Sequence, residues 1–428
     1  MRKITLSVFM ALLLCGCTVQ PERLLAEPPP SVAQPSIAPS PLPAVSVPPE
    51  PSPEVPPPEE PSEAPEPIRA TIQFAGDIIL HTSPIRGAET GRDTYDFKPF
   101  FEAVAPYING DLALCNMESP VDVFGNNQNI STYPRFNAPY EILEALKHAG
   151  FNHLLNGNNH VFDKGMSGLE ATLRNFDKAG FASDGARADG ESFQKPTVLD
   201  VNGIQVGLLS YTESVNGLDS LATEEQSAYA VRRFSTEHTE DIPRMSEDIA
   251  TLRSAGAELV VVSLHWGAEY HDAPTEIQRE IAESLCDAGA DVILGGHSHC
   301  VQPIEWYNRD GARCLIMYSL GNFFADQTAL ENPIGKTQYG ALVTLSVSKS
   351  PDGDITLDGC TALPTLCCRD KSGTLGVTHS ILPLSGGSES VPAFVTDEGN
   401  RAWGRRAFEH VLKIIGGGFV RGTDLLDT

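Results

Sequence analysis

Residues 292–299 read VILGGHSH, an apolar run that ends on two glycines and leads directly into two histidines. A short apolar run of this kind is typical of a buried strand, and residues 275–287 before it have the periodicity of a helix. Because ligands bind beyond the carboxyl ends of strands in open α/β sheets, the histidines stand where a binding site is expected. Glycines without a Cβ leave room for a metal ion to approach the imidazoles. The stretch therefore predicts an α/β fold with a functional strand end.

The same order of elements recurs along the chain. Helical segments end on Ala-Gly pairs, and an apolar strand follows within a few residues, as expected when a glycine adopts the left-handed conformation past a helix. The strands expected are 71–75, 112–116, 153–156, 259–264, 292–294 and 314–319. The helices expected are 139–148, 166–178, 243–254 and 275–287. This alternation predicts a layered α/β domain.

Other segments predict antiparallel strands. Residues 197–201 and 204–211 flank Asn202-Gly203, a pair that suits the primed turn of a hairpin. Further strands are expected at 341–348 and 355–362. The sheets should therefore be mixed.

Six strand ends carry polar side chains that can bind a metal ion. These residues are Asp77, Glu118, Asn159 with His160, His265, the pair His297 and His299, and Asn322. Carboxylate, amide and imidazole ligands suit hard to borderline divalent ions, and the lack of Cys at these points disfavours a thiolate zinc site. We expect Mn²⁺, Fe²⁺ or Zn²⁺. Two such ions about 3.5–4 Å apart could bind a phosphate ester and activate water for hydrolysis.

Several of these residues also have an ordinary explanation. Asp77 could cap a turn, and Asn158 is expected to be a turn residue that accepts a left-handed conformation. His265 could be a packed histidine, while His297 and His299 could belong to a polar loop.

Three further residues could orient a ligand or contact the substrate, namely Asn116, Glu269 and Asn322. Alternatively, Glu269 could pair with Arg279 at the surface, and Asn322 could only satisfy a loop.

The polar runs at these strand ends resemble the bacterial capsule synthesis protein family CapA, also described as poly-γ-glutamate biosynthesis proteins. The runs are Gly76-Asp77, Asn116-Met117-Glu118, Asn158-Asn159-His160, His265-Trp266-Gly267-Ala268-Glu269, Gly296-His297-Ser298-His299 and Ser319-Leu320-Gly321-Asn322-Phe323. The resemblance covers residues 70 to about 330. Since that family is similar to the calcineurin-like metallophosphoesterases, it implies a four-layered α/β/β/α sandwich with mixed sheets and a two-metal centre.

The resemblance also implies a role for each residue. It places Asp77 and His299 on one ion, Asn159, His265 and His297 on the other, and Glu118 between the two. His160 would be an imidazole that does not bind metal, and that stabilises the phosphoryl oxygen or protonates the leaving group.

This sequence departs from the phosphoesterase pattern at two positions. Ile79 stands where those enzymes carry a histidine ligand, and the bridging carboxylate is Glu118 and not an aspartate. His81 could supply the missing ligand only if the chain turns back after Asp77.

The first seventeen residues have the features of an export signal. Arg2 and Lys3 precede an apolar stretch, residues 4–14, that is too short to span a bilayer. Residues 14–17 read LCGC and resemble the lipobox of bacterial lipoproteins, which implies lipidation of Cys17. The alternative is an ordinary secretory signal, and Cys15 is an unusual occupant of a lipobox. We expect a lipid-anchored protein of the cell membrane that faces away from the cytoplasm.

Residues 18–67 should form a disordered spacer, because they are rich in proline and lack aromatic residues. In polyproline II form, at about 3.1 Å per residue, its forty or so proline-rich residues could reach about 120 Å from the membrane. A net charge of −26 argues against a nucleic-acid partner. An anionic substrate would need a local cationic centre, such as metal ions.

The chain has nine cysteines, and those beyond Cys17 are odd in number. A full disulfide framework is therefore not expected. Most should be small buried hydrophobic residues, with one bridge expected within residues 360–368.

The resulting functional hypothesis is a metal-dependent hydrolase in residues 68–350 that acts on an anionic capsule or cell-wall polymer. Membrane proteins of capsule synthesis are further expected partners. The alternative is a non-catalytic factor that uses the metal pocket to bind the polymer for export or assembly. Residues 351–428 show a weak pattern with one helix expected at 400–414, and the sequence assigns them no role.

Overall fold

The computed structural model describes residues 66–309, 311–327, 336–385 and 391–420. The expected signal peptide with Cys17 lies outside these residues, as does the spacer except for its last two positions. The described residues belong to one compact unit, Glu63–Thr428. Within these ranges no helix has both the length and the apolar character that crossing a bilayer requires.

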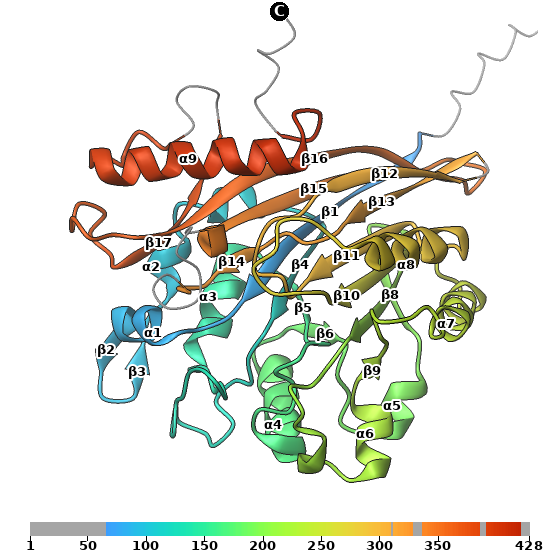
Figure 1. Cartoon of the computed structure of the whole chain (residues 1–428), viewed down its shortest axis with the longest axis horizontal. Helices are drawn as coiled ribbons and strands as arrows, with labels where there is room; N and C mark the ends of the chain where they lie inside the picture. Colours follow the sequence, from blue (N-terminus) through green and yellow to red (C-terminus); the bar gives the residue numbers. More distant parts are fainter. Residues whose placement is uncertain (1–65, 310, 328–335, 386–390, 421–428) are drawn as a thin grey trace, which may run out of the picture. The chain divides into compact units, whose positions relative to one another are not determined.

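The first sheet is built around β1 (Ile68–Ile78) (Figure 1). Its order is β17-β16-β15-β1-β4-β5-β6, and β14 also pairs with β1. β4 and β14 are parallel to β1 and β15 is antiparallel, so the sheet is mixed. The other strands are β4 (Leu112–Met117), β5 (His153–Leu155), β6 (Ala182–Asp184), β14 (Asn322–Phe324), β15 (Tyr339–Lys349), β16 (Ile355–Arg369) and β17 (His379–Pro383).

The second sheet has the order β12-β13-β11-β10-β8-β7, and β9 also pairs with β8. Its strands are β7 (Thr197–Val201), β8 (Ile204–Thr212), β9 (Arg232–Arg233), β10 (Leu259–His265), β11 (Val292–Gly296), β12 (Ile304–Arg309) and β13 (Ala312–Met317). β7 and β8 form the predicted hairpin, with positive φ angles of 50° at Asn202 and 86° at Gly203, as a primed turn requires.

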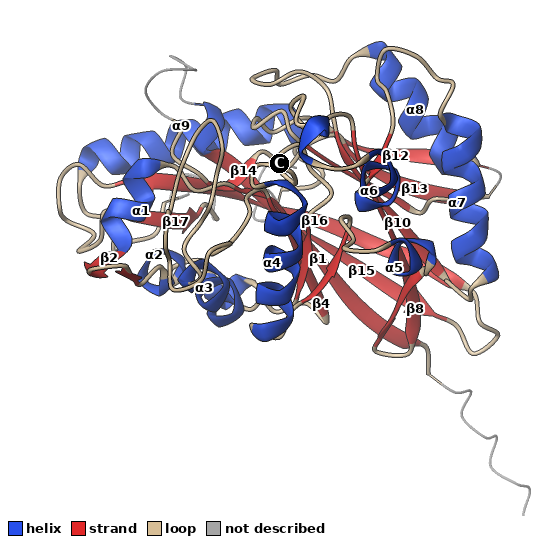
Figure 2. Cartoon of the chain, turned by 90° about the horizontal axis from the view of Figure 1, so that it is seen from below, coloured by secondary structure: helices blue, strands red, loops and turns tan. Residues whose placement is uncertain are grey.

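The two sheets pack face to face. Phe74 and Val343 of the first sheet lie in one apolar core with Val206 and Val261 of the second. Helices α1 (Thr82–Ala88), α2 (Lys98–Phe101) and α3 (Glu141–Ala149) cover the outer face of the first sheet. Helices α7 (Ile242–Ser254) and α8 (Glu276–Asp287) cover the outer face of the second. Figure 2 shows the strands between these two groups of helices. The predicted four-layered α/β/β/α sandwich with mixed sheets is confirmed.

The predicted Ala-Gly helix ends are also confirmed. After α3, α4 (Gly165–Lys178), α7 and α8, the glycine has a φ of 112°, 76°, 98° and 111°, respectively. The sequence did not predict the shorter elements, whose few residues show no clear period. Besides α1, α2, β6, β9, β12, β14 and β17, these are β2 (Glu89–Gly91), β3 (Thr94–Tyr95), α5 (Gly190–Gln194), α6 (Glu224–Ala230) and the 3₁₀ turns η1 (Ala105–Tyr107), η2 (Asp219–Leu221) and η3 (Lys336–Gln338).

The segment after residue 350 belongs to the same unit. β16 and β17 extend the first sheet beyond β15, and α9 (Glu398–Ile415) lies along β16 (Figure 1). Phe408 and Val411 of α9 join the core between the sheets together with Leu366 and Leu382. The structure therefore draws no boundary at residue 350.

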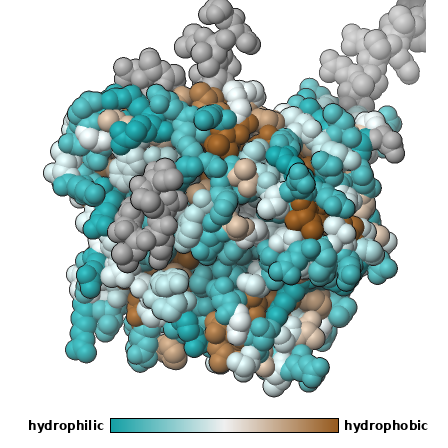
Figure 3. Space-filling view, in the orientation of Figure 1, coloured by the Kyte–Doolittle hydropathy of each residue, from teal (hydrophilic) through white to brown (hydrophobic). Residues whose placement is uncertain are grey.

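The surface seen in Figure 3 is mostly hydrophilic, with apolar residues in scattered spots. The large apolar side chains that are exposed among the described residues are Ile68, Phe124, Tyr133, Leu221 and Phe394.

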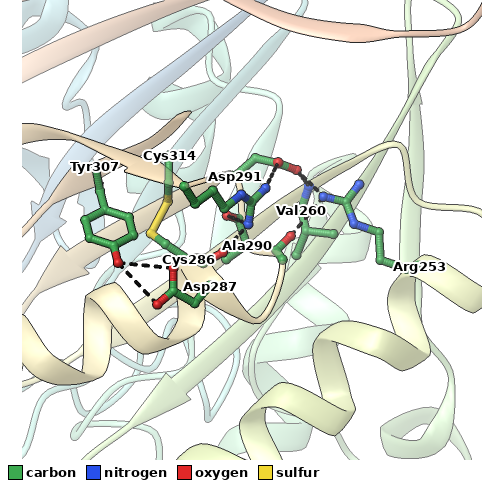
Figure 4. Close-up of a disulfide and its surroundings, with 10 residues drawn as sticks. Arg253, Val260, Cys286, Asp287, Ala290, Asp291, Tyr307 and Cys314 are labelled. Atoms are coloured by element: carbon green, nitrogen blue, oxygen red, sulfur yellow. Dashed lines mark hydrogen bonds and ion pairs between the residues drawn. A yellow bond between two sulfur atoms is a disulfide. The ribbon is translucent and has the colours of Figure 1, made fainter. Parts of the chain in front are cut away.

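A disulfide joins Cys286, at the end of α8, to Cys314 of β13 (Figure 4). The bridge expected within residues 360–368 is wrong, because Cys360, Cys367 and Cys368 are free. The sequence could not show the real pair, since its 28-residue separation closes only when β13 pairs with β11, the strand that follows α8.

Candidate metal centre

Strand register brings the predicted side chains to one edge of both sheets. Asp77 of β1 lies beside Asn116 of β4 and Asn322 of β14, and His265 of β10 lies beside Gly296 of β11. A Cβ on Gly296 would lie 3.0 Å from Asp77 Oδ1. Glycine at this position therefore lets the ends of the two sheets meet, which places Asp77 and His265 in one site.

The first group of possible ligands surrounds His265 Nε2. This atom lies 3.0 Å from Asn159 Oδ1, 3.2 Å from Glu118 Oε1 and 3.2 Å from His297 Nδ1. Asn216 accepts a hydrogen bond of 3.3 Å from Asn159 Nδ2, which turns the amide oxygen of Asn159 toward His265. Glu118, His265 and His297 each offer one donor atom, and these atoms lie within 4.8 Å of one another. Such convergence is what the ligands of one cation require.

A second group contains Asp77, Glu118 and His299, again with one donor atom each within 4.8 Å of the others. His299 Nδ1 lies 3.8 Å from Asp77 Oδ2, and its Nε2 lies 4.0 Å from Glu118 Oε1. Glu118 thus belongs to both groups, which is the arrangement that a bridging ligand needs. Ile79 has no donor atom in its side chain, which is buried against Phe136.

The carboxylate of Glu118 is fully buried, and neither of its oxygens makes a hydrogen bond within the described residues. Burial, and next the charge of Asp77, raise the pKa of Glu118 to about 8. An unpartnered buried carboxylate is costly, and a divalent cation between the two groups would satisfy both oxygens. The residues present therefore fit a metal centre.

Hydrogen bonds from Asn158 to Asn116 and from Asn116 to Asp77 hold the carboxylate of Asp77 in place. Asn116 Nδ2 donates to Asp77 Oδ1 at 2.8 Å, and Asn158 Nδ2 donates to Asn116 Oδ1 at 2.9 Å and to Met117 O at 3.0 Å. The left-handed conformation expected for Asn158 is wrong, because Asn158 is not among the described residues with positive φ. Its amide fixes the orientation of the residue that holds Asp77.

Asn322 orients His299. Its Nδ2 donates to Gln327 Oε1 and Thr337 O, so its Oδ1 must be the acceptor for His299 Nδ1 at 2.9 Å. The proton of His299 is then on Nδ1, which leaves Nε2 for a cation. Asn322 follows the expected strand 314–319 in the chain but does not lie at the end of that strand in space. It opens β14 in the other sheet, and its contacts are more than those of a residue that only satisfies a loop.

His160 lies beside the two groups without belonging to either among the described residues. Its Nδ1 is 2.9 Å from Asp163 Oδ2, which also accepts the backbone N–H of Phe136 at 2.6 Å. Burial alone would lower the pKa of His160, but the hydrogen bond with Asp163 and the nearby carboxylates raise it above its ordinary value. Asp163 was not predicted, and its only signal in the sequence is its position three residues after His160.

Glu269 stands at the rim of the site. Its side chain is 42% exposed, and its Oε1 lies 4.0 Å from His299 Nε2. The alternative pairing with Arg279 is wrong, because Arg279 pairs with Glu305 at 2.8 Å.

His81 shows that the chain does turn back after β1, since it stands directly before α1. Its ring lies 5.5 Å from that of Phe136, and burial, followed by the charge of His299, lowers its pKa to about 4. It belongs to neither group of possible ligands among the described residues.

The backbone of the site is strained. Among the described residues, the non-glycine positions with positive φ are Asn or Asp except for Tyr270 (66°), His297 (83°) and His299 (55°). Larger side chains rarely adopt this conformation, and it persists where surrounding contacts hold it. Tyr270 N donates to Ser298 O at 2.7 Å, and its ring stacks on that of His299 at 6.1 Å. No pattern in the sequence predicts a role for Tyr270.

Known proteins resemble this chain over the region that contains the site. The family model described as bacterial capsule synthesis protein PGA_cap matches residues 71–327. The capsule biosynthesis protein CapA of Bacillus anthracis is 31% identical over 60% of this chain and 60% of its own length. The PGA biosynthesis protein CapA of Bacillus subtilis is 31% identical over 65% of this chain and 68% of its own. Among solved structures, Haemophilus influenzae NAD nucleotidase NadN aligns over 84% of this chain and 66% of its own, with 14% identity and a TM-score of 0.38.

Proposed function

Because the chain belongs to the bacterial capsule synthesis protein family PGA_cap, we propose that it is a metal-dependent hydrolase of capsule or poly-γ-glutamate biosynthesis. The observation that carries the proposal is the buried Glu118 carboxylate, which lies between two groups of possible ligands and has no hydrogen bond of its own. In this proposal Cys17 carries a lipid that anchors the protein to the cell membrane, outside the cytoplasm.

The ligands of one ion would be Asn159, His265, His297 and Glu118, and those of the other Asp77, His299 and Glu118. Divalent Mn, Fe or Zn bound there would polarise a phosphoryl oxygen and lower the pKa of a water molecule. Asn116 and Asn322 hold ligands in position through the hydrogen bonds described above.

His160 would act as the general acid. Its Nδ1–H donates to Asp163, so a second proton on Nε2 is available to the leaving oxygen. The raised pKa of His160 favours this protonated form. The ring of Phe136, 4.8 Å away and edge-on, fixes the plane of the imidazole.

Two variants separate metal binding from proton transfer. Purified full chain should release metal-stimulated product from a generic phosphodiester such as bis(p-nitrophenyl) phosphate in the presence of Mn²⁺. His297→Ala should lose both bound metal and turnover, whereas His160→Gln should keep bound metal and lose turnover. His148→Asn is the matched control, because His148 lies at the surface in a pair with Glu102. Unchanged turnover in His160→Gln at full metal content would contradict the proposed role of His160.

Ile79 favours a second candidate function. The group of Asp77, Glu118 and His299 has only three donors, and the buried side chain of Ile79 occupies the position expected to supply a fourth. A single tightly held ion would suit a non-catalytic factor that binds an anionic polymer for assembly or export. Elemental analysis separates the two candidates, since two tightly held ions per chain favour the hydrolase and one favours the binding factor. A screen of phosphoesters, peptides and γ-glutamyl polymers then tests turnover directly.

A further inference from the structure

Arg135 and Lys164 are two neighbouring cations, and no ion pair with a carboxylate holds either of them in the described part of the chain. Arg135 Nε donates to the carbonyl of Asp163 at 2.7 Å, and Lys164 Nζ donates to the carbonyl of Arg135 at 3.1 Å. Within the described ranges, neither cation forms an ion pair with a carboxylate at 4.0 Å or less. Other arginines differ, as Arg187 does by pairing with Asp184 at 3.2 Å. Both cations are thus fixed in place while their charge is retained.

These cations are next in sequence to two residues that contact His160. Arg135 directly precedes Phe136. The ring centroid of Phe136 lies 4.8 Å from that of His160 and 5.5 Å from that of His81. Lys164 directly follows Asp163, the partner of His160. Each cation is therefore one residue away from a group that positions His160.

The positive charge of Arg135 and Lys164 is opposite in sign to the net charge of the whole chain. Fifty-six acidic residues against thirty basic ones give a net charge of −26, which repels a polyanion at long range. Burial, and next the charge of Arg135, lower the pKa of Lys164, and the charge of Asp163 offsets only part of this effect, so the two like charges held together are unfavourable. An anionic group bound between them would remove this repulsion.

The hydrogen bond from Arg135 to the backbone of Asp163 uses only part of the Arg135 guanidinium. Arg135 is exposed and uses only Nε for its bond to Asp163, so the two terminal nitrogens of its guanidinium make no hydrogen bond among the described residues. Those nitrogens form the part of the side chain that binds carboxylates in a fork geometry.

Exposed apolar groups flank the two cations. Tyr133, two residues before Arg135, is 67% exposed, and Leu221 is 38% exposed. A Cβ on Gly165, the residue after Lys164, would lie 3.4 Å from Leu221 O, so Leu221 is beside this point. The surface offers both charge and apolar contact, which suits a chain of carboxylates separated by methylene groups.

We propose that Arg135 and Lys164 form a binding platform that holds a carboxylate-rich polymer next to His160 and the metal centre. The platform rests on the proposed function, since it takes the substrate of that site to be an anionic polymer. It adds a binding site for repeats of the polymer that do not react.

The test compares three double variants of the full, metal-loaded chain with the unaltered chain, using a labelled poly-γ-glutamate fragment of defined length and fluorescence anisotropy. Arg135→Gln with Lys164→Gln should raise Kd about tenfold at about 50 mM salt, and the difference should shrink at about 500 mM because salt screens exposed charges. Lys371→Gln with Arg406→Gln removes the same charge from cations on the loop after β16 and on α9, and should change Kd less than about twofold. Arg135→Lys with Lys164→Arg keeps the charge and should retain affinity. Thermal unfolding of each variant shows whether it is folded.

The outcomes separate the platform from the proposed function. If the unaltered chain binds and the first double variant binds equally well, the platform is overturned and the proposed function stands. Equal weakening by the control pair also overturns the platform, because the effect then follows net charge alone. If the unaltered chain does not bind the polymer at either salt concentration, the platform and the polymer part of the proposed function both fail.

Discussion

Glu118→Gln should stabilise the metal-free protein and weaken the stabilisation that metal ions give. The reason is the buried carboxylate, whose pKa is raised from 4.5 to about 8 by burial and by the charge of Asp77. Between these two values the unfolded chain has lost the proton that the folded chain retains, so stability falls as pH rises from 4.5 to about 8. At pH 7 the raised pKa of Glu118 lowers the free energy of unfolding by about 3 kcal/mol, because each pH unit above the ordinary pKa costs about 1.4 kcal/mol. Glutamine has the same shape and carries no such cost.

The assay is thermal unfolding at pH 7, first in EDTA and then with excess Mn²⁺. In EDTA, Glu118→Gln should raise Tm by about 6 °C, given about 2 °C per kcal/mol for a domain of this size. With metal at about 100 times its Kd, the unaltered chain gains about 2.7 kcal/mol, and the variant should gain much less. Glu269→Gln is the control, because its half-exposed carboxylate should change Tm little in EDTA. The reasoning is refuted if Glu118→Gln is the less stable protein in EDTA, or if metal shifts both proteins equally.

Three further predictions concern the rest of the fold. Burial lowers the pKa of His153 from 6.5 to about 4, so the free energy of unfolding should fall as pH decreases through this range. His153→Leu should remove about 3 kcal/mol of that loss, measured by urea unfolding at pH 7 and pH 4.5. Replacing Cys286 and Cys314 by alanine should lower the free energy of unfolding by about 3 kcal/mol, given the 28-residue separation, and a reducing agent should then leave the stability of the variant unchanged. Tyr270→Gly should relieve a positive φ of 66° and raise the free energy of unfolding by about 1 kcal/mol, while phosphodiester turnover falls. A gain in stability with full turnover would mean that Tyr270 has no role at the site.

The sequence predicted the main strands and helices and most of the polar residues that meet at the site. These predictions succeeded because each rests on a local pattern. The positive φ of Gly150, for example, requires only that a helix ends one residue earlier, and His265 follows directly from the apolar run of β10.

What the sequence missed depends on contacts between distant segments. Asn322 was predicted as a site residue, but not the three-residue strand that it opens in the first sheet; this crossing is possible because Gly76 has no Cβ, which would lie 1.8 Å from Gly321 O. Asn216 reaches Asn159 from 57 positions away, and Cys314 reaches Cys286 only through sheet pairing. None of these pairs follows a period or a spacing that a single sequence can display.

Without bound metal, several features of the site destabilise the folded chain. Glu118 is buried without a hydrogen bond, and His297, His299 and Tyr270 have backbone angles that large side chains disfavour. Each feature costs about 1–3 kcal/mol in other proteins, so their combination at one place requires support from the surrounding structure. That support comes from the two sheets, whose register fixes Asp77 and His265 at adjoining strand ends, and from the amides that orient the ligands. A fold that needed only stability would fill this space with apolar residues, as it does at Ile79 two positions after Asp77. The local strain, the unpartnered carboxylate and the convergence of donor atoms have one common explanation, which is the binding of cations at this edge.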